Sequence, residues 1–138
     1  MIKQNPLFLP LLIQVFLTFF LLFRMAFLRV TSILKGEVKM EAIALRQLAW
    51  NEKSIKAQNS FHNQLETPIL FYLGIVLAVL CGLNSNVFLI LSWVYVGARI
   101  FHALVHNTTN NVSIRFRFFL VSCLSLLAQW VILALHLL

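Results

Sequence analysis

Four long apolar segments constrain this 138-residue chain more than any other feature of its sequence. A helix needs about twenty apolar residues to cross the hydrocarbon core of a membrane. Four segments are long enough: Leu7 to Leu28, Phe61 to Leu83, Val87 to His106, and Phe116 to Leu138. Hydrophobic residues make up 61% of the chain, and a soluble domain of this size could not bury so much apolar surface. We therefore predict an all-α integral membrane protein whose residues 1–138 form one domain, a four-transmembrane-helix bundle in contact with membrane lipid.

The cations of the connecting segments predict how the helices are oriented. Six of the eleven Lys and Arg residues lie between Arg29 and Lys56, and Arg115 and Arg117 follow the third segment. Cytoplasmic loops carry an excess of such residues, so we expect these two connections in the cytoplasm and both termini on the non-cytoplasmic side. The net charge of +7 does not indicate nucleic-acid binding, because no exposed aromatic side chains accompany the cations to stack on bases.

The first connection is predicted to contain a helix of its own. Apolar residues recur in it near helical spacing, namely Val38, Ala42, Leu45, Leu48 and Ala49. In the first apolar segment, Gln14 and Thr18 lie one turn apart and prefer protein to lipid. We expect these two side chains to contribute to a surface shared between subunits.

Two groups of polar side chains fall within the second and third apolar segments. Each group has the spacing of one helical face: Asn59, Asn63 and Glu66 in the second, and Arg99, His102 and His106 in the third. A charge inside a bilayer costs roughly 2.5–3.5 kcal/mol on insertion scales, so it needs a partner or a function. Glu66 and Arg99 should lie at similar depth, with Arg115 at the start of the fourth helix. The pattern predicts a cationic pocket with one carboxylate, suited to an anionic, water-soluble ligand.

The same residues can also be interpreted as stabilising the fold, without binding a ligand. Glu66 and Arg99 would then form an interhelical ion pair that fixes packing, and the histidines would bond to their neighbours. Two histidines four residues apart can bind a metal, but no third ligand is evident, so no metal site is predicted. Arg24 can extend its side chain to the interface.

The same residues occur in a pattern that resembles a known family. The segment Asn59 to Pro68 is similar to a second-helix signature in which Asn is followed three residues later by Glu. Ala98 to His102 is similar to a third-helix Arg-x-x-His, and Arg115 follows Arg99 at the family's separation of sixteen residues. Gly36 to Lys39 resembles a short Gly-x-Val-basic segment. The family is MAPEG, the membrane-associated proteins in eicosanoid and glutathione metabolism. The sequences of these segments are most similar to those of its bacterial branch, and this resemblance implies a location in a bacterial inner membrane.

The resemblance implies a homotrimer of four-helix bundles with sites between subunits near the cytoplasmic face. It also implies glutathione as a co-substrate. By resemblance, Asn63 and Glu66 contact the glutathione backbone and amino group, and Arg99, His102 and Lys39 hold its carboxylates. Arg115 is the catalytic candidate that stabilises the thiolate, because a nearby cation lowers the pKa of a thiol. Asn59 and His106 complete the implied binding set.

Several positions depart from the pattern of the well-known enzymes of the family. Asn59 replaces an arginine and His106 a tyrosine, while Phe116 stands where some members carry a serine and Phe119 lies one turn after Arg115. Two functions therefore stay open. One is a glutathione-dependent transferase or peroxidase for lipophilic electrophiles, and the other is a non-catalytic MAPEG-like membrane protein that binds another anionic or lipid-like ligand. A small multidrug transporter is disfavoured, because the first segment lacks the acid that such transporters carry there.

Overall fold

The computed structural model describes residues 5–44 and 49–138, and all regular secondary structure in these ranges is helical. The elements are α1 (Phe8–Leu34), α2 (Met40–Ile43), α3 (Glu52–His62), α4 (Thr67–Leu80), α5 (Asn86–Asn107) and α6 (Val112–Leu137). By length and composition, four membrane crossings are formed by α1, by α3 with α4, by α5 and by α6. The predicted all-α architecture with four transmembrane helices is thus confirmed.

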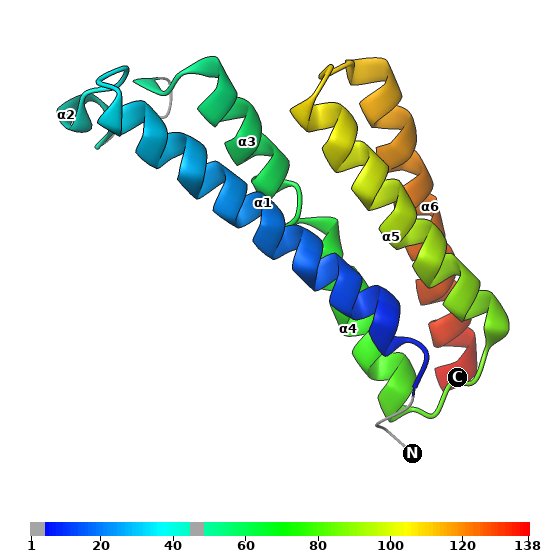
Figure 1. Cartoon of the computed structure of the whole chain (residues 1–138). Coiled ribbons are helices and arrows are strands. Elements are labelled where there is room, and N and C mark those ends of the chain that lie inside the picture. Colours follow the sequence, from blue (N-terminus) through cyan, green and yellow to red (C-terminus); the bar gives the residue numbers. More distant parts are fainter. Residues whose placement is uncertain (1–4, 45–48) are drawn as a thin grey trace.

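The crossings are arranged as two groups (Figure 1). α1 runs beside α3 and α4, while α5 and α6 form an antiparallel pair. The α1–α3 and α5–α6 connections lie at one end of the molecule, and both termini lie at the other. Successive crossings run in opposite directions, so the first and third connections, which carry the cations, share one end, as the sequence predicts. Because the number of crossings is even, both termini share the other end.

Two glycines end helices and turn the chain. Gly36 follows α1 with φ 70° and Gly82 follows α4 with φ 68°, a conformation that costs glycine little. In both places the next residue donates its N–H to a carbonyl five residues earlier, Glu37 to Ser32 and Leu83 to Ala78, which satisfies the last carbonyls of the helix. The turn after Gly82 is short and leads directly into α5.

The second crossing is broken, whereas the sequence pattern predicted one continuous helix. α3 ends at His62 and α4 begins at Thr67. The reason is Pro68, which has no N–H to donate to the carbonyl of Gln64, so the hydrogen bonds of α3 cannot continue through this position. Asn59, Asn63 and Glu66 therefore do not form one helical stripe. Asn59 lies exposed on α3, while the other two lie within the break.

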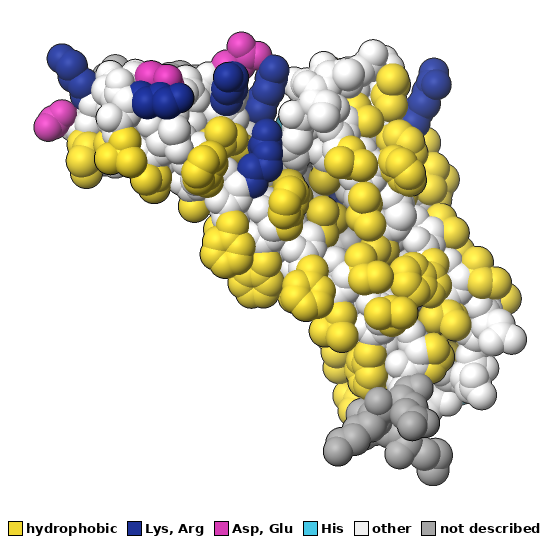
Figure 2. Space-filling model, viewed as in Figure 1, with side chains coloured by type: hydrophobic (Ala, Val, Ile, Leu, Met, Phe, Trp, Pro, Cys, Tyr) yellow, Lys and Arg dark blue, Asp and Glu magenta, His cyan; other side chains and the backbone are white. Residues whose placement is uncertain are grey.

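The core lies between α4, α5 and α6. Phe71 and Ile75 of α4, Tyr95 of α5, and Leu126 and Leu133 of α6 are buried together, and the rings of Phe71 and Tyr95 stack with centroids 4.4 Å apart. On the outer surface, apolar side chains are spread along the length of the visible face, while charged side chains gather at the end with the α1–α3 connection (Figure 2). Such a surface suits lipid rather than water around the helices.

Two polar residues of α1 form bonds within the chain. Gln14 is fully buried and donates from Nε2 to Oε1 of Gln64 at 2.9 Å. The hydroxyl of Thr18 lies 3.3 Å from that of Tyr72. These side chains thus join α1 to the second crossing, and the surface that they are expected to share with another subunit stays a prediction.

The predicted helix of the first connection is short where it can be described. α2 covers Met40–Ile43, and Val38 just before it is buried. Leu45 and Leu48, on which the prediction also depended, lie outside the described residues.

Candidate functional site

A pocket of about 220 Å³ lies where the break in the second crossing meets α5 and the start of α6. Four of the eight predicted site residues line it, namely Asn63, Glu66, His102 and Arg115. Its apolar lining comes from Val112, Phe116 and Phe119. The pocket therefore combines one cation, one carboxylate and two neutral hydrogen-bonding groups with an apolar wall.

Arg115 lies in the first turn of α6. Asn111 caps this helix, because its side chain accepts a hydrogen bond from the N–H of Ile114 at 3.1 Å. Arg115 is half-buried and donates from Nη1 to Oδ1 of Asn110 at 2.9 Å. Since Asn110 is a neutral amide, it orients the guanidinium group without cancelling its charge. An anion in the pocket would meet that charge.

Three side chains of α5 face the break. Arg99, His102 and His106 have exposed fractions of 0%, 4% and 3%, so the prediction that they share one face of the third crossing is confirmed. The ring of His102 lies near those of His106 and Phe119, with centroids 6.0 and 6.1 Å away. Nδ1 of His106 is 3.5 Å from Nδ2 of Asn63. These contacts place His102 at the pocket and His106 behind Asn63.

Arg99 does not form the predicted ion pair with Glu66. Its guanidinium group instead donates to the backbone carbonyl of Asn63, just after the end of α3, where the last carbonyls of a helix lack intrahelical partners. In residues 5–44 and 49–138, the single ion pair joins Glu52 to Lys56 at 2.7 Å. Glu66 is exposed at the pocket, whereas Arg99 is fully buried and does not line the pocket.

Two predicted site residues lie away from the pocket. Lys39 is exposed directly before α2, and Asn59 is exposed on α3, and neither lines the pocket. In the part of the chain that the structure describes, no three His, Cys, Asp or Glu side chains form a group that could hold a metal ion.

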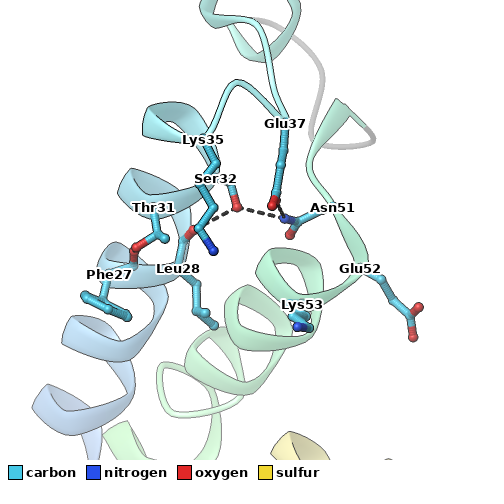
Figure 3. Close-up of a pocket in the computed structure, with 9 residues that line it drawn as sticks. All are labelled: Phe27, Leu28, Thr31, Ser32, Lys35, Glu37, Asn51, Glu52 and Lys53. Carbon is cyan, nitrogen blue, oxygen red and sulfur yellow. Dashed lines mark hydrogen bonds between the residues drawn. The ribbon is translucent and has the colours of Figure 1, made fainter.

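A larger pocket, of about 550 Å³, lies between the end of α1 and the start of α3 (Figure 3). The side chain of Asn51 donates to both Ser32 Oγ and Glu37 Oε2, each at 2.7 Å, and its Oδ1 accepts from the N–H of Ser54 at 2.9 Å. These bonds tie the α1–α3 connection together. None of the predicted site residues lines this pocket.

Sequence reasoning missed a polar network that joins three helices. Arg24 of α1 donates to Oδ1 of Asn107 on α5 at 2.5 Å, and Nδ2 of Asn107 donates to Ser60 of α3 at 2.7 Å. Arg24 therefore bonds across the bundle instead of only reaching toward the interface. The signal in the sequence was that Asn107 directly follows His106, at the same end of the bundle as Arg24.

Comparison with known proteins agrees with this arrangement. The sequence model of the MAPEG family matches residues 7–135, which is nearly the whole chain. No curated protein and no solved structure gives a significant match. The four apolar crossings, the pocket at their junction and the extent of this match lead to one conclusion: the chain is an integral membrane protein that belongs to the MAPEG family.

Proposed function

We propose that this protein is a glutathione-dependent transferase or peroxidase that acts on lipophilic electrophiles within the membrane. Membership of the MAPEG family supports a membrane function connected with glutathione or eicosanoid metabolism in general. The observation that carries the finer proposal is that Glu66 and Arg115 line one pocket. A carboxylate and a guanidinium group are the partners that an amino group and a thiolate or carboxylate of glutathione require.

In this proposal Arg115 activates the thiol of glutathione. A free thiol has a pKa near 8.5, and a nearby cation lowers it, so more thiolate is present at neutral pH. Arginine stays charged even when partly buried, and its bond to Asn110 leaves that charge available. The thiol proton passes to water, and the thiolate then attacks an electrophilic carbon of a substrate dissolved in the bilayer, so that a carbon–sulfur bond forms as the bond to a leaving group such as halide breaks and the halide departs with the electron pair. Glu66 holds the glutathione amino group, while Asn63 and His102 donate or accept hydrogen bonds along the tripeptide.

The proposal includes assembly as a homotrimer. Pockets for small molecules usually have volumes of about 300–1,000 Å³, and the pocket of one chain, at about 220 Å³, is smaller. A neighbouring subunit would enlarge and cover it. In such a trimer the exposed side chains of Lys39 and Asn59 come from that neighbour. Crosslinking in mild detergent is expected to yield trimers, and a product limited to monomers and dimers would contradict this part of the proposal.

A second candidate is favoured by the apolar wall of the pocket. Phe116 and Phe119 line it beside Arg115, where they offer no hydrogen bond to a peptide. The alternative is a non-catalytic protein whose pocket binds a different anionic or lipid-like ligand, with the aromatic side chains in contact with its apolar part.

The decisive experiment measures glutathione binding to the purified protein by calorimetry, together with the ultraviolet absorbance of the thiolate. We expect the wild type to bind glutathione and form thiolate, and Arg115→Ala to lose the thiolate signal and conjugation to an aryl halide. Arg117→Ala is the matched control, because Arg117 is an exposed cation on the same helix. A wild-type protein that shows neither binding nor thiolate at saturating glutathione would overturn the proposal in favour of the second candidate.

A further inference from the structure

A groove of about 380 Å³ runs between α1 and α5, separate from the pocket at Arg115. Its walls are apolar along most of their length: Leu17, Phe20, Leu21, Ile100, Ala103 and Leu104. Three polar residues, Arg24, Asn107 and Thr108, line its remaining part. We propose that this groove binds one acyl chain of an anionic membrane phospholipid, with the guanidinium group of Arg24 holding the headgroup phosphate.

The polar and apolar parts of the groove are separated along the membrane-crossing direction. α1 and α5 both run toward the end that carries the cation-rich connections (Figure 1). Arg24 is the last lining residue on α1, Asn107 is the last on α5, and Thr108 directly follows that helix. From Leu17 to Arg24, or from Ile100 to Thr108, a helix rises about 10–12 Å. The groove thus has the layout of a lipid, with a polar head at one end and an apolar chain below it.

The charge of Arg24 is available to a ligand. Its Nη1 donates to Asn107, whose own amide nitrogen is used by Ser60 and by the carbonyl of Ala103, at 2.7 and 2.8 Å. This network holds the guanidinium group in place but contains no acid. In the described part of the chain, no carboxylate pairs with Arg24. Four of the five guanidinium N–H donors lie outside the bond to Asn107, and a planar fork of donors matches a phosphate.

The location of the polar end also fits a headgroup. α5 ends at Asn107, so Arg24 and Thr108 lie at the level where the third crossing leaves the hydrocarbon core. Cations at that level attract the anionic lipids of a leaflet. Thr108 is exposed there, but its hydroxyl already donates to the carbonyl of Leu104 at 2.7 Å, so the guanidinium group supplies the donors for the phosphate. An anionic phospholipid fills both parts of the groove, whereas a soluble phosphate ester would leave the apolar walls unused.

The test uses the full chain, stripped of lipid in mild detergent and titrated with phosphatidylglycerol, with retained lipid counted by native mass spectrometry. We expect one tightly retained phosphatidylglycerol per chain and weaker retention of phosphatidylcholine. Arg24→Gln should weaken phosphatidylglycerol about fivefold, in line with one interfacial cation. Arg117→Gln, which removes an exposed cation elsewhere at the same end, should leave retention unchanged.

A second variant keeps the test valid if Arg24→Gln fails to fold. Leu104 is 54% exposed at the edge of the groove, so Leu104→Trp narrows the groove without disturbing the core. It should reduce retention of phosphatidylglycerol while Arg24 is intact. Equal retention of both lipids, no effect of either variant, or full competition by soluble glycerol phosphate would overturn the proposal. Glutathione binding does not enter these readouts, since the two sites share no lining residue.

Discussion

The guanidinium group of Arg99 donates a hydrogen bond to the backbone carbonyl of Asn63, so that a charge on α5 stabilises the end of α3. The guanidinium group is removed from water, since Arg99 has an exposed fraction of 0%. A cation beside the last carbonyls of a helix is favourable because those groups carry the negative end of the helix dipole. This contact fixes the break that shapes the candidate site.

Arg99→Ala is expected to destabilise the protein strongly. It removes a large buried side chain and leaves the Asn63 carbonyl without its donor, and large-to-small changes in a core cost about 2–5 kcal/mol. Arg99→Met should cost less, because it keeps most of the volume and loses only the polar contact. Thermal unfolding in detergent measures both variants. Arg117→Ala serves as the control, and a melting temperature for Arg99→Ala equal to that of this control would contradict the role of Arg99.

Glu66→Gln is expected to leave stability nearly unchanged. An ion pair between Glu66 and Arg99 was one interpretation of the sequence, but these two residues form no ion pair, and Glu66 is exposed. Exposed substitutions usually change stability by less than about 0.5 kcal/mol. Glutathione affinity should fall roughly tenfold, since a charge-assisted hydrogen bond contributes about 1.5–3 kcal/mol. Parallel thermal unfolding and calorimetry separate the two effects, and a large loss of stability would refute this assignment.

Gln14 and Gln64 should behave as a coupled pair. Their buried amides bond at 2.9 Å, so Gln14→Leu leaves Gln64 without a partner, and Gln64→Leu does the reverse. The double variant should be less destabilised than the sum of the two, with a coupling of roughly 0.6–1.7 kcal/mol, as for hydrogen bonds between transmembrane helices. A double-mutant cycle by thermal unfolding measures it. Strict additivity would mean that the bond contributes nothing to stability.

The orientation in the membrane is testable with reporters. We expect a reporter fused after Leu138 to lie outside the cytoplasm, and one inserted near Lys53 to lie inside it. The physical basis is the excess of cations in the first and third connections, which lie at one end of the molecule. If both reporters lie on the sides opposite to these, the predicted orientation is wrong, although the fold is unaffected.

The helices and most of their ends could be predicted from the sequence, because local chemistry determines them. Twenty-residue apolar stretches specify crossings, and Gly82 followed by Ser85 specifies a turn and a cap, where the Ser85 hydroxyl accepts from the N–H of Phe88 at 3.2 Å. The break before Pro68 also has a local cause, but it was not predicted because Pro68 lies in a segment that is apolar enough to indicate one continuous helix. A proline inside a hydrophobic segment should have indicated two half-helices.

The partners of the polar residues could not be predicted in the same way. The positions of Glu66 and Arg99 in their segments predict a similar depth in the bilayer for the two residues. Depth alone, however, does not determine which acceptor the guanidinium group bonds to. The break supplied a free carbonyl at Asn63, and Arg99 bonds to that instead. The hydrogen bond between Arg24 and Asn107 depends on how α1 packs against α5, and the sequence around either residue does not determine that packing. The sequence predicted the lining residues Asn63, His102 and Arg115 from two sources. One is the spacing of the polar residues along the helices, and the other is the resemblance to a family pattern, which carries information on residues far apart in the chain.

The break in the second crossing also allows the chain to change neighbours halfway through the membrane. α3 packs mainly on α1, whereas α4 packs mainly on α6. A straight helix would have to follow one of these directions throughout its length. The bend at residues 63–66 lets each half align with a different partner. Arg99 stabilises this bend through its bond to the Asn63 carbonyl, so a charged residue in an apolar environment determines the course of the second crossing.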